Sequence, residues 1–291
     1  TACAEVMREK GAHIEPKGAV MDIVGTGGDE VGSFNISTTA AFVAASGGVP
    51  VAKHGNRSVS SKSGAADVLE ELGVVLSLTP EQNEKVLADA GICFLFAQGY
   101  HKSMKNVAPV RKGMGERTIF NVLGPLSNPA RATMQLLGVY DENLVMPMAQ
   151  VLSNLGVTRG MVVCGGGMDE ASLIGENKVC EIRNGRLIPY QLSPEKYGLS
   201  LCTVDDLRGG SPKVNAQITR DILSGREQGA KREEILLNAG IAVKIIENNL
   251  ERCEALSELL PGATIIHGDG TDRDLLDEEG LATCGAVVAL T

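Results

Sequence analysis

Short apolar runs alternate with helical patterns along most of this 291-residue chain. The runs predicted to be strands are 20–24, 49–52, 92–97, 135–140 and 160–164, with a short extended piece at 74–78. The segments predicted to be helices are 38–46, 64–72, 79–90 and 143–155, and "TPEQ" at 79–82 forms a capping box with proline at the first helical position. A hairpin is predicted over 181–190 about Asn184-Gly185. This alternation is typical of an α/β fold with a mainly parallel sheet covered on both faces, in which ligands collect at the carboxyl ends of strands.

Composition narrows the class of protein. The net charge of -9 argues against general binding to nucleic acid or to an anionic membrane, because phosphate-rich surfaces need a basic face. The seven cysteines are scattered and odd in number, which disfavours a disulfide scaffold or a zinc site and favours the reducing cytoplasm. No apolar run approaches 18 residues and no signal peptide opens the chain. We therefore expect a cytoplasmic protein that binds neither nucleic acid nor membrane.

The first candidate site is the glycine-rich loop "GTGGDEVGSFNIST" at 25–38, directly after the first predicted strand. Gly25, Gly27 and Gly28 allow positive φ and close approach of a ligand to the backbone. Asn35 and the hydroxyls after it open a helix, and a helix amino terminus attracts anions. Two interpretations stay open: a phosphate cradle, or a capped helix after a glycine turn.

The second candidate is "KHGNRSVSSKSG" at 53–64, after the second predicted strand. It concentrates Lys53, Arg57 and several serines at a strand end, which suits a polyanionic ligand. A solvated basic loop is the alternative, but the two loops together favour a phosphate site.

The third candidate is the segment 108–130, in which Arg111 and Arg117 precede the apolar stretch "TIFNVLGPL". A guanidinium beside a hydrophobic wall could pair with a carboxylate on an aromatic ring, although arginines on a helix surface are common.

The fourth candidate is "GGGMDEAS" at 165–172, where Asp169 and Glu170 stand on a glycine loop. Adjacent carboxylates offer the hard oxygen ligands of a Mg²⁺ ion that also grips phosphates; simple solvation is the alternative.

Taken in order, "GTGGD", "FNIST", "KHGNRSVSSKSG", "MKNVAPVR", "RTIFNVLGPLSNP" and "DE" closely resemble the anthranilate phosphoribosyltransferase family over residues 1–242. The resemblance implies a large α/β domain of the nucleoside phosphorylase and phosphoribosyltransferase type, and a homodimer. It implies transfer of 5-phosphoribosyl from phosphoribosyl pyrophosphate (PRPP) to the amine of anthranilate, a step of tryptophan biosynthesis, with Mg²⁺ as cofactor. The substrate amine is then the nucleophile, and no residue is assigned as acid or base.

The same resemblance implies a set of site residues. PRPP would be held by Gly25, Gly28, Asp29, Ser33, Asn35, Ile36, Ser37, Thr38, Lys53, His54, Gly55, Asn56, Arg57, Ser58, Val59, Ser60, Ser61 and Ala65. Anthranilate would be held by Gly25, Asn56, His101 and Arg111, and Mg²⁺ by Ser37, Asp169 and Glu170. Ala65 departs from the family, in which a serine is frequent at this position.

Both ends of the chain depart from the family. Most of the family's small amino-terminal helical domain, which makes dimer contacts, is expected to be missing. Residues 243–291 are predicted to form β-α-β-α-β and resemble part of the NAD-binding regulatory domain of potassium-uptake proteins (RCK type), without its glycine motif upstream of Glu247. We therefore predict a catalytic domain at 1–242, a partial Rossmann-like fragment at 243–291 and a chimeric chain.

Three functions remain open from the sequence. The leading one is the phosphoribosyl transfer. The alternatives are a catalytically silent chimera or nucleotide-binding regulatory protein, and a pyrimidine nucleoside phosphorylase, which lacks the "KHGNR" and "RTIFN" combination seen here.

Overall fold

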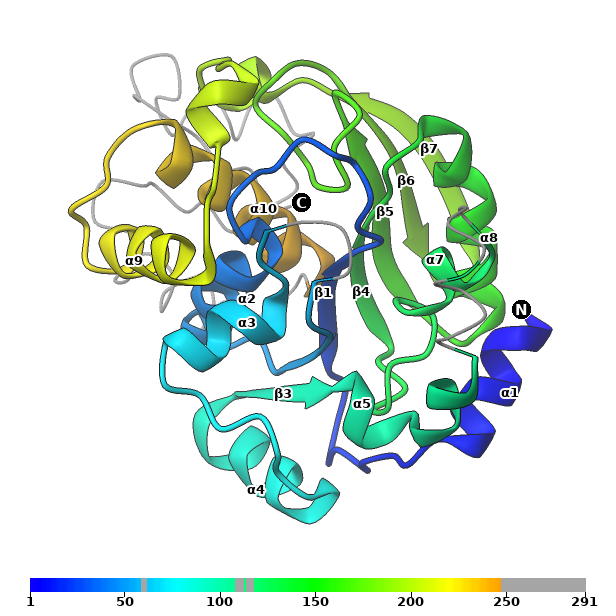
Figure 1. Cartoon of the computed structure of the whole chain (residues 1–291). Coiled ribbons are helices and arrows are strands. Elements are labelled where there is room, and N and C mark those ends of the chain that lie inside the picture. The colour runs from blue at the N-terminus through cyan, green and yellow to red at the C-terminus, as the bar shows by residue number, and fades with distance from the viewer. Residues whose placement is uncertain (59–61, 108–112, 114–117, 247–291) are drawn as a thin grey trace.

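A single mixed sheet forms the centre of the fold in the computed structural model, which describes residues 1–58, 62–107, 113 and 118–246 (Figure 1). In the described residues the strand order is β3-β2-β1-β4-β5-β6-β7. The strands are β1 (Met21–Gly25), β2 (Val51–Gly55), β3 (Ile92–Phe96), β4 (Met134–Gly138), β5 (Arg159–Gly165), β6 (Asn177–Arg183) and β7 (Arg186–Leu192). The first five strands pair in parallel, whereas β6 and β7 add an antiparallel hairpin at one edge.

The predicted α/β class and the five parallel strands are confirmed, each prediction overlapping an observed strand. The hairpin about Asn184-Gly185 is confirmed as the turn between β6 and β7. The extended piece predicted at 74–78 is not a strand.

Helices cover both faces of the sheet. They are α1 (Ala2–Lys10), α2 (Ile36–Ser46), α3 (Ala65–Glu71), α4 (Pro80–Ala90), α5 (Ala97–Tyr100), α7 (Phe120–Leu123), α8 (Val145–Asn154), α9 (Pro212–Leu223) and α10 (Ala230–Ile246), with short 3-10 turns η1 (Lys102–Asn106), η2 (Glu142–Leu144), η3 (Pro194–Tyr197) and η4 (Val204–Leu207). The capping box predicted for α4 is present, because Thr79 Oγ1 accepts from Gln82 N at 3.3 Å and Gln82 Oε1 accepts from Thr79 N at 2.9 Å.

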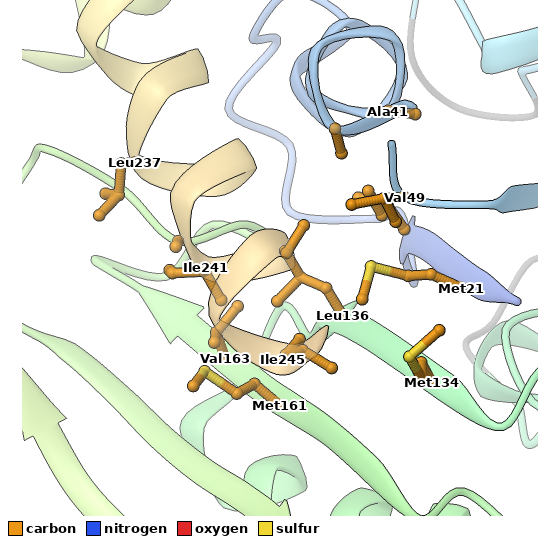
Figure 2. Packing of buried hydrophobic residues seen from close by; sticks show 14 of the residues in the cluster. Met21, Ala41, Val49, Met134, Leu136, Met161, Val163, Leu237, Ile241 and Ile245 are labelled. Carbon is orange, nitrogen blue, oxygen red and sulfur yellow. The ribbon is translucent and has the colours of Figure 1, made fainter. Parts of the chain in front are cut away.

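The interior strand β5 is apolar on both sides, as a doubly covered sheet favours. On β5, Met161 and Val163 join the cluster beneath α2 and α10, whereas Val162 and Cys164 join the cluster beneath α1 and α8. Figure 2 shows the first cluster, in which the side chain of Ile241 on α10 lies among those of β4 and β5. α2 and α10 therefore form one layer and α8 belongs to the other.

The order of the strands creates a switch point at the centre of the sheet. The chain runs from β1 outward through β2 to β3, then returns to place β4 on the other side of β1. In doubly wound sheets the connections on either side of such a point leave in opposite directions, which opens a crevice at the carboxyl ends of the two strands. Here those ends are Gly25 and Gly138, which are partners in the β1–β4 register.

The strand predicted to begin at residue 243 is wrong. Residues 243–246 are the last turn of α10, and Ile245 is 4% exposed in the core beneath that helix. A short run of β-branched residues fits a buried strand or a buried helix equally well, so its pattern alone does not decide. The rest of the predicted tail, 247–291, lies outside the described residues.

In the part of the chain that the structure describes, no helix is both long and apolar enough to cross a membrane.

Candidate functional site

The glycine-rich loop lies at the switch point and meets the acidic loop after β5. Gly27 and Gly28 adopt φ of 72° and 83°, the left-handed region that glycine tolerates best. At Gly25 the requirement is space: a Cβ atom there would overlap the carboxylate of Asp169. The two loops are therefore packed directly on each other.

Two hydrogen bonds join the acidic pair to the glycine-rich loop and to the start of α2. Gly27 N donates to Asp169 Oδ2 at 2.5 Å, and Ser37 N donates to Glu170 Oε1 at 3.1 Å. The structure thus brings together the first and fourth candidate motifs. Because α2 begins at Ile36, the positive end of its dipole also faces this place.

The acidic pair is strongly desolvated. Burial raises the pKa of Asp169 to about 7, and the nearby carboxylate of Asp29 adds to the shift. Burial and the negative charge of Asp169 raise the pKa of Glu170, while Lys53 opposes that rise. A cation placed between these groups would relieve their repulsion.

Lys53 is the buried cation of the site. Its side chain on β2 is 3% exposed, and its ammonium donates to Ile23 O and, at 3.3 Å, to Ser37 Oγ. Burial lowers the pKa of Lys53, whereas Asp22 and Glu170 raise it. The second candidate loop thus contributes its charge to the same crevice as the other two.

The donor set suits Mg²⁺. Asp169, Glu170 and the Ser37 hydroxyl offer hard oxygen atoms; Glu170 is buried, Asp169 is half-buried, and the negative charge of Asp169 raises the pKa of Glu170. Among the described residues no three His, Cys, Asp or Glu side chains gather closely enough to hold a metal alone. Mg²⁺ usually keeps several waters and binds through one or two carboxylates and substrate phosphates.

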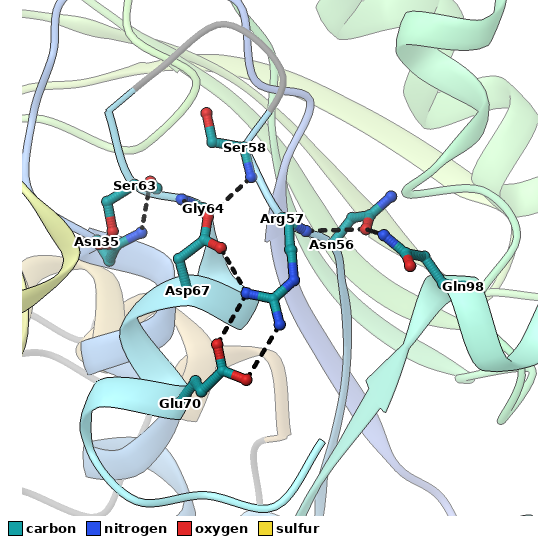
Figure 3. A network of polar contacts seen from close by, with 9 residues as sticks. All are labelled: Asn35, Asn56, Arg57, Ser58, Ser63, Gly64, Asp67, Glu70 and Gln98. Carbon is teal, nitrogen blue, oxygen red and sulfur yellow. Dashed lines mark hydrogen bonds and ion pairs between the residues drawn. The ribbon is translucent and has the colours of Figure 1, made fainter. Parts of the chain in front are cut away.

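Asn35 links the two phosphate-binding candidates to each other. Its Nδ2 donates to Ser63 O at 3.2 Å, and its Oδ1 accepts from Ser63 Oγ at 3.1 Å (Figure 3). Asn215 on α9 donates to the same oxygen at 2.9 Å. Nothing in the sequence pattern around Asn215 pointed to this contact, because an asparagine early in a helix is ordinary.

Arg57 is paired with carboxylates of the helix that follows its loop. Its guanidinium lies 2.9 Å from both Asp67 and Glu70 on α3, and these hydrogen bonds raise the pKa of Arg57. Asp67 also accepts from Ser58 N at 3.0 Å and from Gly64 N at 2.9 Å, so one carboxylate bridges both ends of the loop. The prediction that Arg57 holds PRPP remains a prediction, and binding would require the guanidinium to share or leave these carboxylates.

The residues predicted to contact anthranilate lie at different depths. Asn56 is exposed, and its Oδ1 accepts from Gln98 Nε2 at 3.5 Å. His101 is 7% exposed and its ring meets the His54 ring edge-on at 5.2 Å. Arg111 falls outside the described residues.

Several predicted PRPP residues are buried. The His54 ring bonds to Gly124 O at 3.1 Å, and burial lowers its pKa to about 3, so it is a neutral interior group. Ile36 and Thr38 are almost fully buried. The other described members of the set are half-buried or exposed: Gly28, Asp29, Ser33, Gly55, Ser58 and Ala65. Val59, Ser60 and Ser61 fall outside the described residues.

Comparison with known proteins gives one consistent match. Residues 17–261 match the model of the glycosyl transferase family, a/b domain, which continues past the boundary predicted at 243. The anthranilate phosphoribosyltransferase of Endomicrobium trichonymphae is 54% identical over 261 residues, covering 89% of this chain and 77% of that protein. That of Ruminiclostridium cellulolyticum is 54% identical over 263 residues, with the same two coverages.

Solved structures match over the same part of the chain. The anthranilate phosphoribosyltransferase of Thermus thermophilus has a TM-score of 0.82 and 44% identity, covering 89% of this chain and 78% of that one. The enzyme from Saccharomyces cerevisiae in complex with PRPP and Mg has a TM-score of 0.78 and 31% identity, covering 88% and 72%.

Proposed function

Because the chain belongs to the anthranilate phosphoribosyltransferases of the glycosyl transferase family, we propose that it transfers 5-phosphoribosyl from PRPP to anthranilate, giving phosphoribosylanthranilate and pyrophosphate. The observation that carries the proposal is the meeting of Asp169 and Glu170 with Gly27 N and Ser37 N at the switch point of the sheet. That meeting supports a single site for a phosphorylated donor and its metal ion.

At the ribose carbon C1 the reaction forms one bond and breaks another. The anthranilate amine bonds to C1 of the ribose, the C1–oxygen bond to pyrophosphate breaks, and the amine gives up a proton to solvent. No protein base is required, because the substrate amine carries its own lone pair, and His54 and His101 are both buried. Catalysis then rests on holding the two substrates in line and on stabilising the charge of the departing pyrophosphate.

The chain supplies these contributions from three places. The glycine-rich loop and the amino terminus of α2 would hold the phosphates, as the anion preference of a helix start favours. Lys53 would place a buried positive charge close to them. Asp169, Glu170 and Ser37 would hold Mg²⁺, which when bound neutralises charge on the leaving pyrophosphate.

Related structures support this assignment of ligands. A Saccharomyces cerevisiae relative is solved in complex with PRPP and Mg, and another structure of that enzyme in complex with 4-fluoroanthranilate. The assignments of Asn56, His101 and Arg111 to anthranilate are part of the proposal. The resemblance of 243–291 to an NAD-binding fragment remains a prediction and contributes no step.

The test is a fluorescence assay. Anthranilate fluorescence should fall when PRPP and Mg²⁺ are both added, and should stay constant when PRPP is omitted or Mg²⁺ is removed by a chelator. A parallel titration with NAD addresses the regulatory alternative: NAD binding without loss of anthranilate would overturn the proposal in favour of that alternative.

A further inference from the structure

Helix α10 holds the acidic loop by its backbone, although the two are far apart in the chain. Asn238 accepts from Ala171 N at 3.2 Å through Oδ1 and donates to Ala171 O at 2.8 Å through Nδ2. Its side chain is fully buried. A primary amide can make this double contact because it carries both an acceptor and donors. One side chain thus fixes the peptide groups of the residue that follows Glu170.

Glu234, one turn earlier on α10, holds the same loop two residues further on. Its Oε2 accepts from Leu173 N at 2.9 Å, and its side chain is also fully buried. Asn238 Nδ2 donates in addition to the backbone carbonyl of Glu234, one turn earlier in the helix, at 3.0 Å. Burial raises the pKa of Glu234 to about 8.

The residue between these two contacts is held as well. Ser172 N donates to Asn177 Oδ1 at 2.6 Å, and Asn177 Nδ2 donates to Ser172 O at 2.9 Å. Three consecutive residues after Glu170 are therefore bound by three buried polar side chains, two of them from α10. Together with Gly165 N, which donates to Glu170 O at 3.0 Å, these contacts fix the backbone that carries the acidic pair.

We propose that Asn238 and Glu234 are positioning residues that set the geometry of Asp169 and Glu170 for a divalent metal ion bound with pyrophosphate. The inference rests on the metal role given to Asp169 and Glu170 in the proposed function. Neither side chain touches substrate; each acts through the backbone of the loop.

The test measures metal binding directly rather than turnover. Mn²⁺ serves as a spectroscopic substitute for Mg²⁺, and its dissociation constant is measured by electron paramagnetic resonance in the presence of inorganic pyrophosphate. Asn238→Ala and Glu234→Ala should weaken Mn²⁺ binding roughly 10-fold to 100-fold, the range typical when second-layer partners of metal ligands are removed. Hydrogen exchange at the amides of Ala171 and Leu173 should quicken in the respective variants.

Two further variants separate positioning from general destabilisation. Glu234→Gln keeps an oxygen for Leu173 N and stays neutral, so it should bind Mn²⁺ within about threefold of the parent. Ile245→Ala removes core volume from the last described turn of α10 and leaves the hydrogen bonds of Glu234 and Asn238 to the acidic loop in place, so it should lower stability and leave Mn²⁺ affinity nearly unchanged. Should Asn238→Ala fail to fold, Asn238→Asp replaces it, since it keeps the acceptor for Ala171 N and lacks the donor.

The outcomes are distinct for the two proposals. Folded Asn238→Ala and Glu234→Ala proteins with unchanged Mn²⁺ affinity would overturn the inference. Parent protein that binds Mn²⁺ and pyrophosphate but consumes no anthranilate would overturn the proposed function and leave the inference standing.

Discussion

Gly25 and Gly138 face each other in the register of β1 and β4, and a Cβ atom on either would overlap Asp169. At Gly138 the overlap is with the backbone of Asp169, which cannot swing aside as a side chain can. The acidic loop therefore packs directly against these two glycines.

The first prediction concerns the packing of the acidic loop against Gly138. Gly138→Ala should lower the free energy of unfolding by about 1–3 kcal/mol, the usual cost of overpacking, and should raise the Mg²⁺ concentration needed for activity. Denaturant unfolding and a Mg²⁺ titration of activity measure the two effects. Gly18→Ala is the matched control, because a Cβ there meets nothing within 4 Å. If Gly138→Ala had the stability and the Mg²⁺ dependence of the parent, the acidic loop would not be packed against β4.

The second prediction concerns the acidic pair itself. Asp169→Asn and Glu170→Gln preserve shape but remove a negative charge, so each should raise the half-saturating Mg²⁺ concentration by roughly tenfold or more. The KM for anthranilate should change much less, and a steady-state titration of each component separates the two quantities. Glu195→Gln, an exposed carboxylate substitution, serves as control. An unchanged Mg²⁺ dependence in both variants would remove the metal role from these residues.

The third prediction concerns Asp67, which accepts from Ser58 N and Gly64 N and also pairs with Arg57. Asp67→Ala frees both ends of the intervening loop and should raise the KM for PRPP by roughly tenfold, about the effect of losing one charge-assisted hydrogen bond. Glu70→Ala is the sharper control, since Glu70 contacts Arg57 but neither loop end. Equal effects of the two substitutions would assign the role to the Arg57 ion pairs instead.

The fourth prediction is a pH dependence of stability that comes from Glu234. Its pKa is about 8 in the folded protein against an ordinary 4.5, so between these values the folded state keeps a proton that the unfolded state has lost. The stabilising contribution of this group is therefore full below about pH 4.5 and is lost as the pH rises toward 8, by at most about 1.4 kcal/mol per pH unit. Glu234→Gln should flatten this part of the curve. Denaturant midpoints of both proteins from pH 5 to 8 provide the measurement, and parallel curves would contradict it.

Much of the fold could be predicted from local pattern. The strands were visible because a parallel sheet covered on both faces needs continuous apolar runs, and α4 was visible through its capping box. The strand predicted at 243 failed because "VKII" carries no turn or cap signal that would distinguish a buried helix from a buried strand.

The candidate site was predictable in its phosphate and acidic loops but not in its supports. Lys53 and Asp169 stand in chemically unusual stretches, so composition alone drew attention to them. Asn215, Glu234 and Asn238 stand in helices whose sequences carry no site motif, and only the packing of α9 and α10 against the loops gives them partners. The engagement of Arg57 by α3 carboxylates likewise depends on side-chain geometry that spacing does not fix.

The strand order has a consequence for how the site comes into being. β1 and its glycine-rich loop are made early, yet their neighbour β4, the acidic loop and α10 follow only after β2 and β3. During synthesis from the amino terminus, the glycine-rich loop is therefore present well before the acidic loop that it contacts. Pairing across such sequence separations is slow compared with local folding. The acidic loop can take up its place on Gly25 only after β4 and β5 have been made, and its hydrogen bonds with α10 form last.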